Sequence, residues 1–253
     1  MKQLLATVTA AEPLAAFHLL TISALDLPQL RAGQLMLARP RTAHLRESYL
    51  RVPLFPIPSI TAPNTCSVLI VRGEEGWTAA ETVARSQAGD ELDIVAPVGN
   101  GFTLEGGARR VLLLGTPSWL APLIALAREA AQKQVEVTLL VERGPYELAP
   151  VLGALLPVEV EYEIVANLAD SLKPVLMWPD QICAAAPAET YRALWEQITP
   201  LGARARSAFA QAMLAPPMAC GFGVCLSCAV EIAGHPRLAC VDGPVFDWAD
   251  LAL

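Results

Sequence analysis

Short apolar runs alternate with turn-forming residues over roughly the first hundred positions of the chain. β-Branched and alternating apolar side chains dominate these runs, which is typical of half-buried strands. Prolines, Gly33 and the Gly89-Asp90 pair stand between the runs. The pattern predicts an antiparallel β-barrel whose strands include residues 4–9, 19–22, 68–72 and 92–95.

The pattern changes near residue 108. A continuous apolar run at 111–115 is typical of a buried strand, and residues 120–133 have the apolar spacing of a helix. A second buried strand follows at 135–141, and this order predicts a βαβ unit with a parallel sheet. Residues 146–171 show no clear pattern. We expect further strands at 174–178 and 181–185, and helices at 188–197 and 203–214.

The composition of the chain bears on whether it binds nucleic acid or spans a membrane. The formal net charge is -7 and Lys and Arg form no run, so we expect no nucleic-acid partner. The mean hydropathy of +0.42 raises the question of a membrane span. The uncharged apolar stretch 111–127 contains glycine and prolines and is shorter than the roughly 20 apolar residues of a spanning helix. Because no secretory core is complete before Glu12, we expect a cytoplasmic chain without a transmembrane segment.

Four of the six cysteines are close together near the C-terminus, with the spacing C-x4-C-x2-C-x11-C. This is the plant-type spacing of a [2Fe-2S] cluster. A short loop brings three thiolates together at little entropic cost, and Gly221 and Gly223 let its N–H groups turn toward the sulfur atoms. The predicted ligands are Cys220, Cys225, Cys228 and Cys240.

Two disulfides or a structural zinc ion are the alternatives for these cysteines. Disulfides are disfavoured in a chain without a signal peptide, and zinc usually takes two C-x2-C pairs where this chain has one. The remaining cysteines, Cys66 and Cys183, are expected to be small buried hydrophobes. His18, His44 and His235 show no ligand spacing and are expected to be structural or surface residues.

Several motifs resemble the electron-transfer subunit of type B dihydroorotate dehydrogenase, a ferredoxin-reductase-like flavoprotein. The match is best at 218–221 and 240–246, around the first and last clustered cysteines. Residues 32–35 look like the family's PGQF turn, and 89–92 followed by 97–102 look like its GDEL…GPLGNGF segment. The order of barrel, βαβ unit and cysteine cluster also resembles the family over nearly the whole chain.

The resemblance implies a multidomain α+β protein. Residues 1–104 would form a FAD-binding-type β-barrel, 105–202 an NAD-binding-like α/β domain and 203–253 a [2Fe-2S] domain. Electrons would pass from NADH to FAD, then through the cluster to FMN in a catalytic partner that oxidises dihydroorotate to orotate in pyrimidine biosynthesis. The expected assembly is a heterotetramer with that FMN-containing dihydroorotate dehydrogenase-like subunit.

The flavin motif departs from the family pattern. Residues 51–55 correspond to its RRPxS element, in which Arg51 could pair with a phosphate while Phe55 replaces a small hydroxyl residue. Residues 73–78 correspond to its GxGT element and carry two carboxylates that would repel phosphates. A barrel retained without flavin is the alternative. The flavin set that the resemblance implies is Arg51, Pro53, Leu54, Gly76, Thr78, Asn100 and Gly101.

The motif that would bind nicotinamide departs from the family pattern more than the flavin motif does. Its glycine-rich turn corresponds to 114–123, where Gly115 remains, Pro117 removes an N–H donor and Trp119 adds bulk. The family's CGP element corresponds to 183–185 and keeps only its cysteine. We therefore expect NAD(H) binding, and NADH oxidation by this chain, to be reduced or absent.

Three functions follow from these observations. The first is an electron-transfer subunit of a dihydroorotate dehydrogenase-like oxidoreductase complex, with a [2Fe-2S] cluster and FAD. The second is a non-enzymatic iron-sulfur scaffold, and the third is a reductase module that serves another oxidoreductase. No Ser-His-Asp or Cys-His arrangement indicates hydrolysis, so we expect no catalytic acid or base in the chain.

Overall fold

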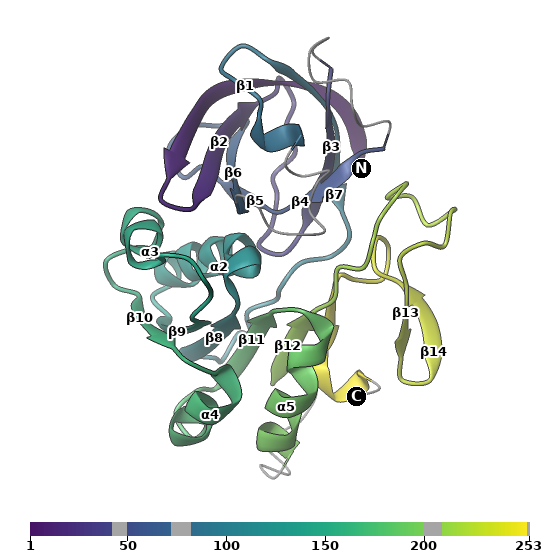
Figure 1. Ribbon diagram of the computed structural model, residues 1–253. Helices are drawn as coiled ribbons and strands as arrows, with labels where there is room; N and C mark the ends of the chain where they lie inside the picture. The colour runs from purple at the N-terminus through teal and green to yellow at the C-terminus, as the bar shows by residue number, and fades with distance from the viewer. Residues whose placement is uncertain (42–49, 72–81, 200–208, 252–253) are drawn as a thin grey trace.

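The computed structural model describes residues 1–41, 50–71, 82–199 and 209–251 (Figure 1). A curled antiparallel sheet forms one end of the molecule, a second sheet flanked by helices forms the other, and a small hairpin unit lies beside both. The fold class predicted from the sequence is confirmed: a barrel precedes an α/β domain and a small C-terminal unit.

The barrel is a seven-stranded antiparallel sheet in the order β4-β3-β7-β1-β2-β6-β5. Its two edge strands are separated in sequence by Phe55 alone, so the sheet curls until its edges nearly meet. Alternate residues of each strand point inward, which is why the apolar alternation was visible in the sequence. The strands are β1 (Lys2–Leu14), β2 (Phe17–Ser23), β3 (Leu35–Pro40), β4 (Val52–Leu54), β5 (Pro56–Pro58), β6 (Thr65–Val71) and β7 (Glu91–Val98).

The second sheet has six strands in the order β10-β9-β8-β11-β12-β15, all parallel except the antiparallel edge strand β15. Helices lie on its faces, and α2 also packs against β5 of the barrel. The strands are β8 (Arg110–Gly115), β9 (Glu136–Glu142), β10 (Glu161–Val165), β11 (Gln181–Ala185), β12 (Ala210–Met213) and β15 (Val245–Asp247). The helices are α2 (Leu120–Gln132), α3 (Ala149–Leu155), α4 (Leu168–Leu172) and α5 (Ala188–Ile198).

Two predicted elements were wrong. The described part of the expected helix at 203–214 is strand β12, which is fully buried between β11 and β15. Its short apolar run carries no periodicity that separates helix from strand, so sheet pairing decides the conformation. The expected strand at 174–178 contains instead the 3-10 helix η3 (Lys173–Val175), because Pro174 cannot donate to a sheet.

The C-terminal unit is joined to both larger parts. A hairpin of β13 (Ala229–Ile232) and β14 (His235–Leu238) follows the first three clustered cysteines. The chain then returns through β15 to the six-stranded sheet, which thus extends beyond the boundary predicted at residue 202. Trp248, in the 3-10 helix η5 (Trp248–Asp250), is buried against Tyr191 with ring centroids 5.2 Å apart.

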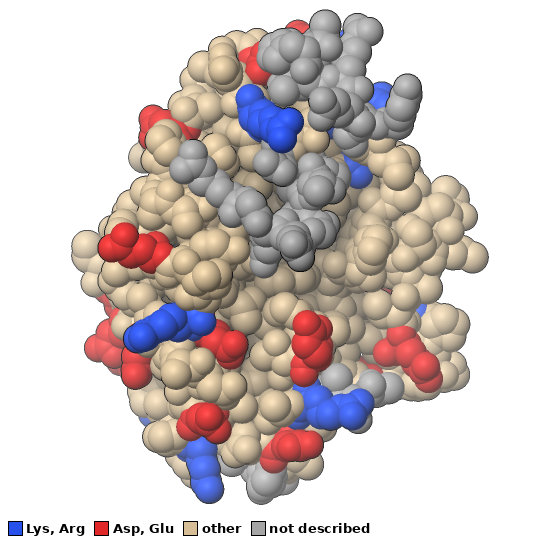
Figure 2. All heavy atoms as spheres, in the orientation of Figure 1, with Lys and Arg blue, Asp and Glu red and all other residues tan. Residues whose placement is uncertain are grey.

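The surface of the protein carries both charged and uncharged side chains. Figure 2 shows acidic and basic side chains interspersed on one face of the molecule, with broad uncharged areas between them. No helix in the described part of the chain combines the length and apolarity needed to cross a membrane.

Candidate functional site

The cysteine-bearing loop lies against the outer wall of the barrel. Gly221 adopts φ +78°, and a Cβ at this position would lie 2.7 Å from Leu37 Cδ1 and 3.5 Å from Val98 Cγ2. Gly223 adopts the same φ, which is costly for other residues. Gly221 lets the loop press against β3 and β7, which places the cysteines next to the barrel, and Gly223 lets the loop approach Leu238 and Val241.

The four predicted ligands form two thiol pairs. Cys228 and Cys240 are buried, and their Sγ atoms are 3.3 Å apart. Cys220 and Cys225 form the more exposed pair and share a side-chain hydrogen bond. The N–H of Phe222 donates to Cys220 Sγ at 3.3 Å. All six cysteines of the chain are free thiols, so the disulfide alternative is not present in this structure.

The two pairs differ in their electrostatic surroundings. Burial opposes ionisation of Cys220, but the N–H groups of Phe222, Cys225 and Val224 outweigh it and lower the pKa of this thiol to about 6. Burial and, to a smaller extent, the neighbouring Cys228 together raise the pKa of Cys240 to about 12. Cys220 in the outer pair therefore favours the negatively charged form, whereas burial keeps Cys240 in the inner pair neutral.

This donor set fits a two-iron cluster better than a single metal ion. In a [2Fe-2S] cluster each iron takes two protein ligands, whereas a structural zinc ion needs four around one point. Two adjacent pairs of thiols are the arrangement that a dinuclear cluster requires.

Arg51, predicted to bind a flavin phosphate, lies just before β4 in an ion-pair network on the outer barrel wall. Its Nη2 donates to both carboxylate oxygens of Asp93, at 2.8 and 3.0 Å, and Arg39 Nε donates to the same carboxylate at 2.9 Å. Burial opposes ionisation of Asp93, but these donors and Gln3 outweigh it and hold its pKa below the ordinary value. Arg51 Nε is buried without a partner among the described residues.

Asp93 was not predicted from the sequence. The available signal was a single carboxylate inside the apolar strand β7, a position where a charged residue needs partners. Those partners come from β1, β3 and the segment before β4, which only the sheet order brings together.

The other predicted flavin residues have varied surroundings. Leu54 points into the barrel core and Pro53 is half-buried on the outer side of β4. Phe55 packs against Trp119, with ring centroids 5.7 Å apart, and both rings are almost fully buried. Gly76 and Thr78 lie outside the described residues. The flavin contacts predicted for this set stay predictions.

Asn100 and Gly101 contact other parts of the protein. Both N–H groups of the Asn100 amide donate to carbonyl groups that follow Cys240 in the chain. A Cβ at Gly101 would lie 2.5 Å from the carbonyl oxygen of Ala32, so a close backbone approach requires this glycine. Of the described residues in the predicted flavin set, Arg51 and Pro53 therefore lie on the outer side of the barrel.

The turn after β8 is packed against α2 and the barrel. A Cβ at Gly115 would lie 2.4 Å from Leu123 Cδ1, so the remaining glycine is needed for packing of α2 against the sheet. The turn continues as the 3-10 helix η2 (Pro117–Trp119), and the Trp119 ring is buried against the barrel residue Phe55. The reduced NAD(H) binding expected from the sequence stays a prediction.

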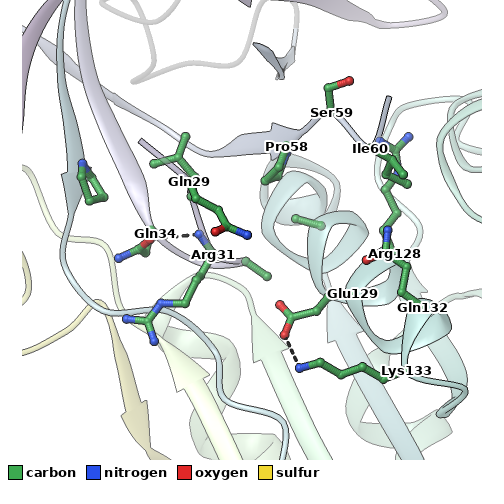
Figure 3. Close-up of a pocket in the computed structure, with 14 residues that line it drawn as sticks. Gln29, Arg31, Gln34, Pro58, Ser59, Ile60, Arg128, Glu129, Gln132 and Lys133 are labelled. Atoms are coloured by element: carbon green, nitrogen blue, oxygen red, sulfur yellow. Dashed lines mark hydrogen bonds and ion pairs between the residues drawn. The ribbon is translucent and has the colours of Figure 1, made fainter. Parts of the chain in front are cut away.

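A cleft of about 720 Å³ lies between the barrel and α2 (Figure 3). Glu129 and Lys133 form an ion pair along its α2 side, while Arg31 and Arg128 lie at opposite sides of the view. Its charged groups do not converge on one point. The residues that line this cleft include none of the predicted site residues.

Comparison with known proteins supports the resemblance. The model of the iron-sulfur cluster binding domain of dihydroorotate dehydrogenase B matches residues 216–252. The dihydroorotate dehydrogenase B (NAD(+)) electron transfer subunit of Caldanaerobacter subterraneus subsp. tengcongensis is 29% identical over 72% of this chain and 73% of its own length. That of Desulforamulus reducens is 27% identical over 81% of each chain. The chain is related to these electron-transfer subunits.

Solved structures show the same fold at lower identity. An NADH-dependent reduced ferredoxin-NADP oxidoreductase structure has a TM-score of 0.76 and 19% identity, covering 96% of this chain and 88% of its own. A ferredoxin NADP+ reductase from Neisseria gonorrhoeae has a TM-score of 0.62 and 16% identity, covering 80% and 92%. The ferredoxin-reductase-like fold expected of a relative of the electron-transfer subunits is thus confirmed.

Proposed function

We propose that this chain is the electron-transfer subunit of a dihydroorotate dehydrogenase B-type complex. The observation that carries the proposal is the set of two adjacent thiol pairs on the barrel wall, within a segment that matches the family's cluster-binding domain. The proposed ligands are Cys220, Cys225, Cys228 and Cys240.

A [2Fe-2S] cluster supplies one-electron transfer, and a bound FAD would supply the exchange between two-electron and one-electron steps. The residues of this chain provide the surroundings. N–H groups that point at Cys220 stabilise negative charge on this thiol. Burial of Cys228 and Cys240 excludes water from the inner pair. Arg51 is the described basic residue of the predicted flavin set and would hold a flavin phosphate.

The surroundings of the outer pair support a protein partner. Large apolar side chains close to the cysteines in sequence are exposed to solvent, which is unusual on a monomer. In Figure 2 the flank where the C-terminal unit lies is largely uncharged. We place the FMN-containing catalytic subunit there, in a heterotetramer in the cytoplasm. The exposed side chains are Phe222 (51%), Val224 (77%), Leu226 (63%) and Val241 (56%).

A non-enzymatic scaffold is the second candidate. The contact between Phe55 and Trp119, and the packing of Leu123 against Gly115, favour a chain that takes its electrons from a donor other than NADH. Both candidates keep the cluster. They differ in whether the purified protein carries a flavin.

An anaerobic absorbance spectrum, with iron, sulfide and released flavin quantified, tests both proposals. We expect about two irons and two sulfides per chain, and bands that bleach with dithionite but not with NADH. Released FAD supports the electron-transfer subunit, and its absence supports the scaffold. A chain without iron and sulfide would contradict both, and bleaching by NADH would show that the turn after β8 still accepts a nicotinamide.

A further inference from the structure

One barrel residue makes an unusual number of hydrogen bonds to the C-terminal unit. The Asn100 amide donates to the carbonyl groups of Asp242, at 3.1 Å, and Val245, at 2.8 Å. Its Oδ1 accepts from the N–H of Val245 at 3.0 Å, and its backbone N–H donates to the carbonyl of Gly243. A single side chain thus connects the end of the barrel to the turn formed by residues 242–245.

The backbones around this contact approach one another closely. Gly99 adopts φ +73°, and a Cβ there would lie 2.4 Å from the carbonyl oxygen of Gly243. A Cβ at Gly243 would lie 2.4 Å from the Phe246 ring. Because only glycine fits at both positions, the contact has a single, closely packed geometry.

The same turn holds the inner thiol pair. Asp242 accepts the N–H of Leu238 on its side chain at 2.8 Å, and its own N–H donates back to the Leu238 carbonyl at 2.7 Å. Ala239, next to Cys240, donates its N–H to the carbonyl of Cys228 at 3.0 Å. Hydrogen bonds therefore run without interruption from Asn100 through Asp242 to the segment that carries Cys240.

We propose that Asn100 is a positioning residue that fixes Cys240, and with it the inner thiol pair, relative to the outer wall of the barrel. The inference rests on the proposed cluster and adds the residue that orients it. The barrel wall also carries Arg51, so the same contact sets the position of the cluster relative to the predicted flavin phosphate site. The side chain that the resemblance linked to flavin serves the iron-sulfur site.

The first test uses the metal-free protein. In Asn100→Ala the turn loses all three side-chain hydrogen bonds, and we expect iodoacetamide to label Cys240 about tenfold faster than in the unsubstituted chain. Cys183 is fully buried in the six-stranded sheet and serves as an internal reference, because it reacts quickly only when the chain unfolds. Unchanged labelling of both cysteines would overturn the inference.

The second test uses the protein with its cluster. Asn100→Asp keeps the size and the oxygen acceptor but removes both N–H donors, so a carboxylate faces two carbonyl groups. We expect a changed electron paramagnetic resonance spectrum of the dithionite-reduced cluster, a shifted reduction potential and faster iron release to a chelator. Asn100→Ser keeps one hydroxyl donor, so its spectrum, reduction potential and rate of iron release should lie between those of Asn100→Asp and the unsubstituted chain. If Asn100→Asp does not fold, Asn100→Ser takes its place in this test.

A matched control separates positioning from general loss of stability. Asn167 caps α4 by accepting the N–H of Asp170 at 3.1 Å, far along the chain from the cysteines. Asn167→Ala should lower the melting temperature while the spectrum and potential stay unchanged. If the Asn100 variants also show only a lower melting temperature, with an unchanged spectrum and potential, the inference fails while the proposed function stands. If the unsubstituted chain binds no iron, the proposed function itself fails.

Discussion

Cys225→Ser is expected to remove most of the iron and the visible absorbance of the purified protein while leaving the barrel folded. Cys225 is exposed, and its Sγ contacts Ser227 Oγ at 3.1 Å at the surface. The substitution therefore leaves the core unchanged, and its effect on the free energy of unfolding should be within about 0.5 kcal/mol in the metal-free chain. Iron analysis, absorbance and circular dichroism on the same sample measure both parts of the prediction.

Cys66→Ala is the control for this experiment. Cys66 is buried in the barrel, and burial raises the pKa of its thiol to about 12, so it is a neutral apolar side chain at physiological pH. The control should keep its full iron content despite a modest loss of stability. Full retention of iron in the Cys225 variant, or loss of iron in the control, would contradict the ligand assignment.

Asp93→Asn is expected to lower the free energy of unfolding by about 3 kcal/mol at pH 7, because it leaves Arg51 partly buried without its carboxylate. The pKa of Asp93 is lowered in the folded state, so its ionised form favours folding above the unfolded-state pKa. This stabilisation is lost as the pH falls through the folded-state value, below the ordinary 3.8. Urea denaturation of both proteins between pH 7 and pH 3 measures the difference.

Glu129→Gln is the matched control for the ion-pair network. Glu129 and Lys133 form an i,i+4 pair at 2.6 Å on the surface of α2, which Figure 3 marks with a dashed line. An exposed pair of this kind contributes about 0.5 kcal/mol or less, since solvent screens it. The prediction for Asp93 would be wrong if both substitutions cost the same, or if the Asp93 effect stayed constant down to pH 3.

The sequence alone identified the parts of the molecule that depend on local pattern. Alternating apolar residues indicated the barrel strands, and the 120–133 periodicity indicated α2, because each pattern matches the repeat of one secondary structure. The spacing of the cysteines predicted a two-iron site, since three thiolates on one short loop need little tertiary structure to converge. The same patterns gave the order of barrel, βαβ unit and cysteine cluster, and the resemblance supplied the cofactors expected of each part.

Only the tertiary structure decided what depends on contacts between distant residues. β12 is a strand because β11 and β15 pair with it, although its short apolar sequence also suits a helix. Asp93 pairs with Arg51 because sheet closure brings separate strands together. Asn100 hydrogen-bonds residues more than a hundred positions away, so its role at the iron-sulfur site left no trace in local sequence. Local patterns record the repeat of an element, whereas these roles arise from which elements become neighbours.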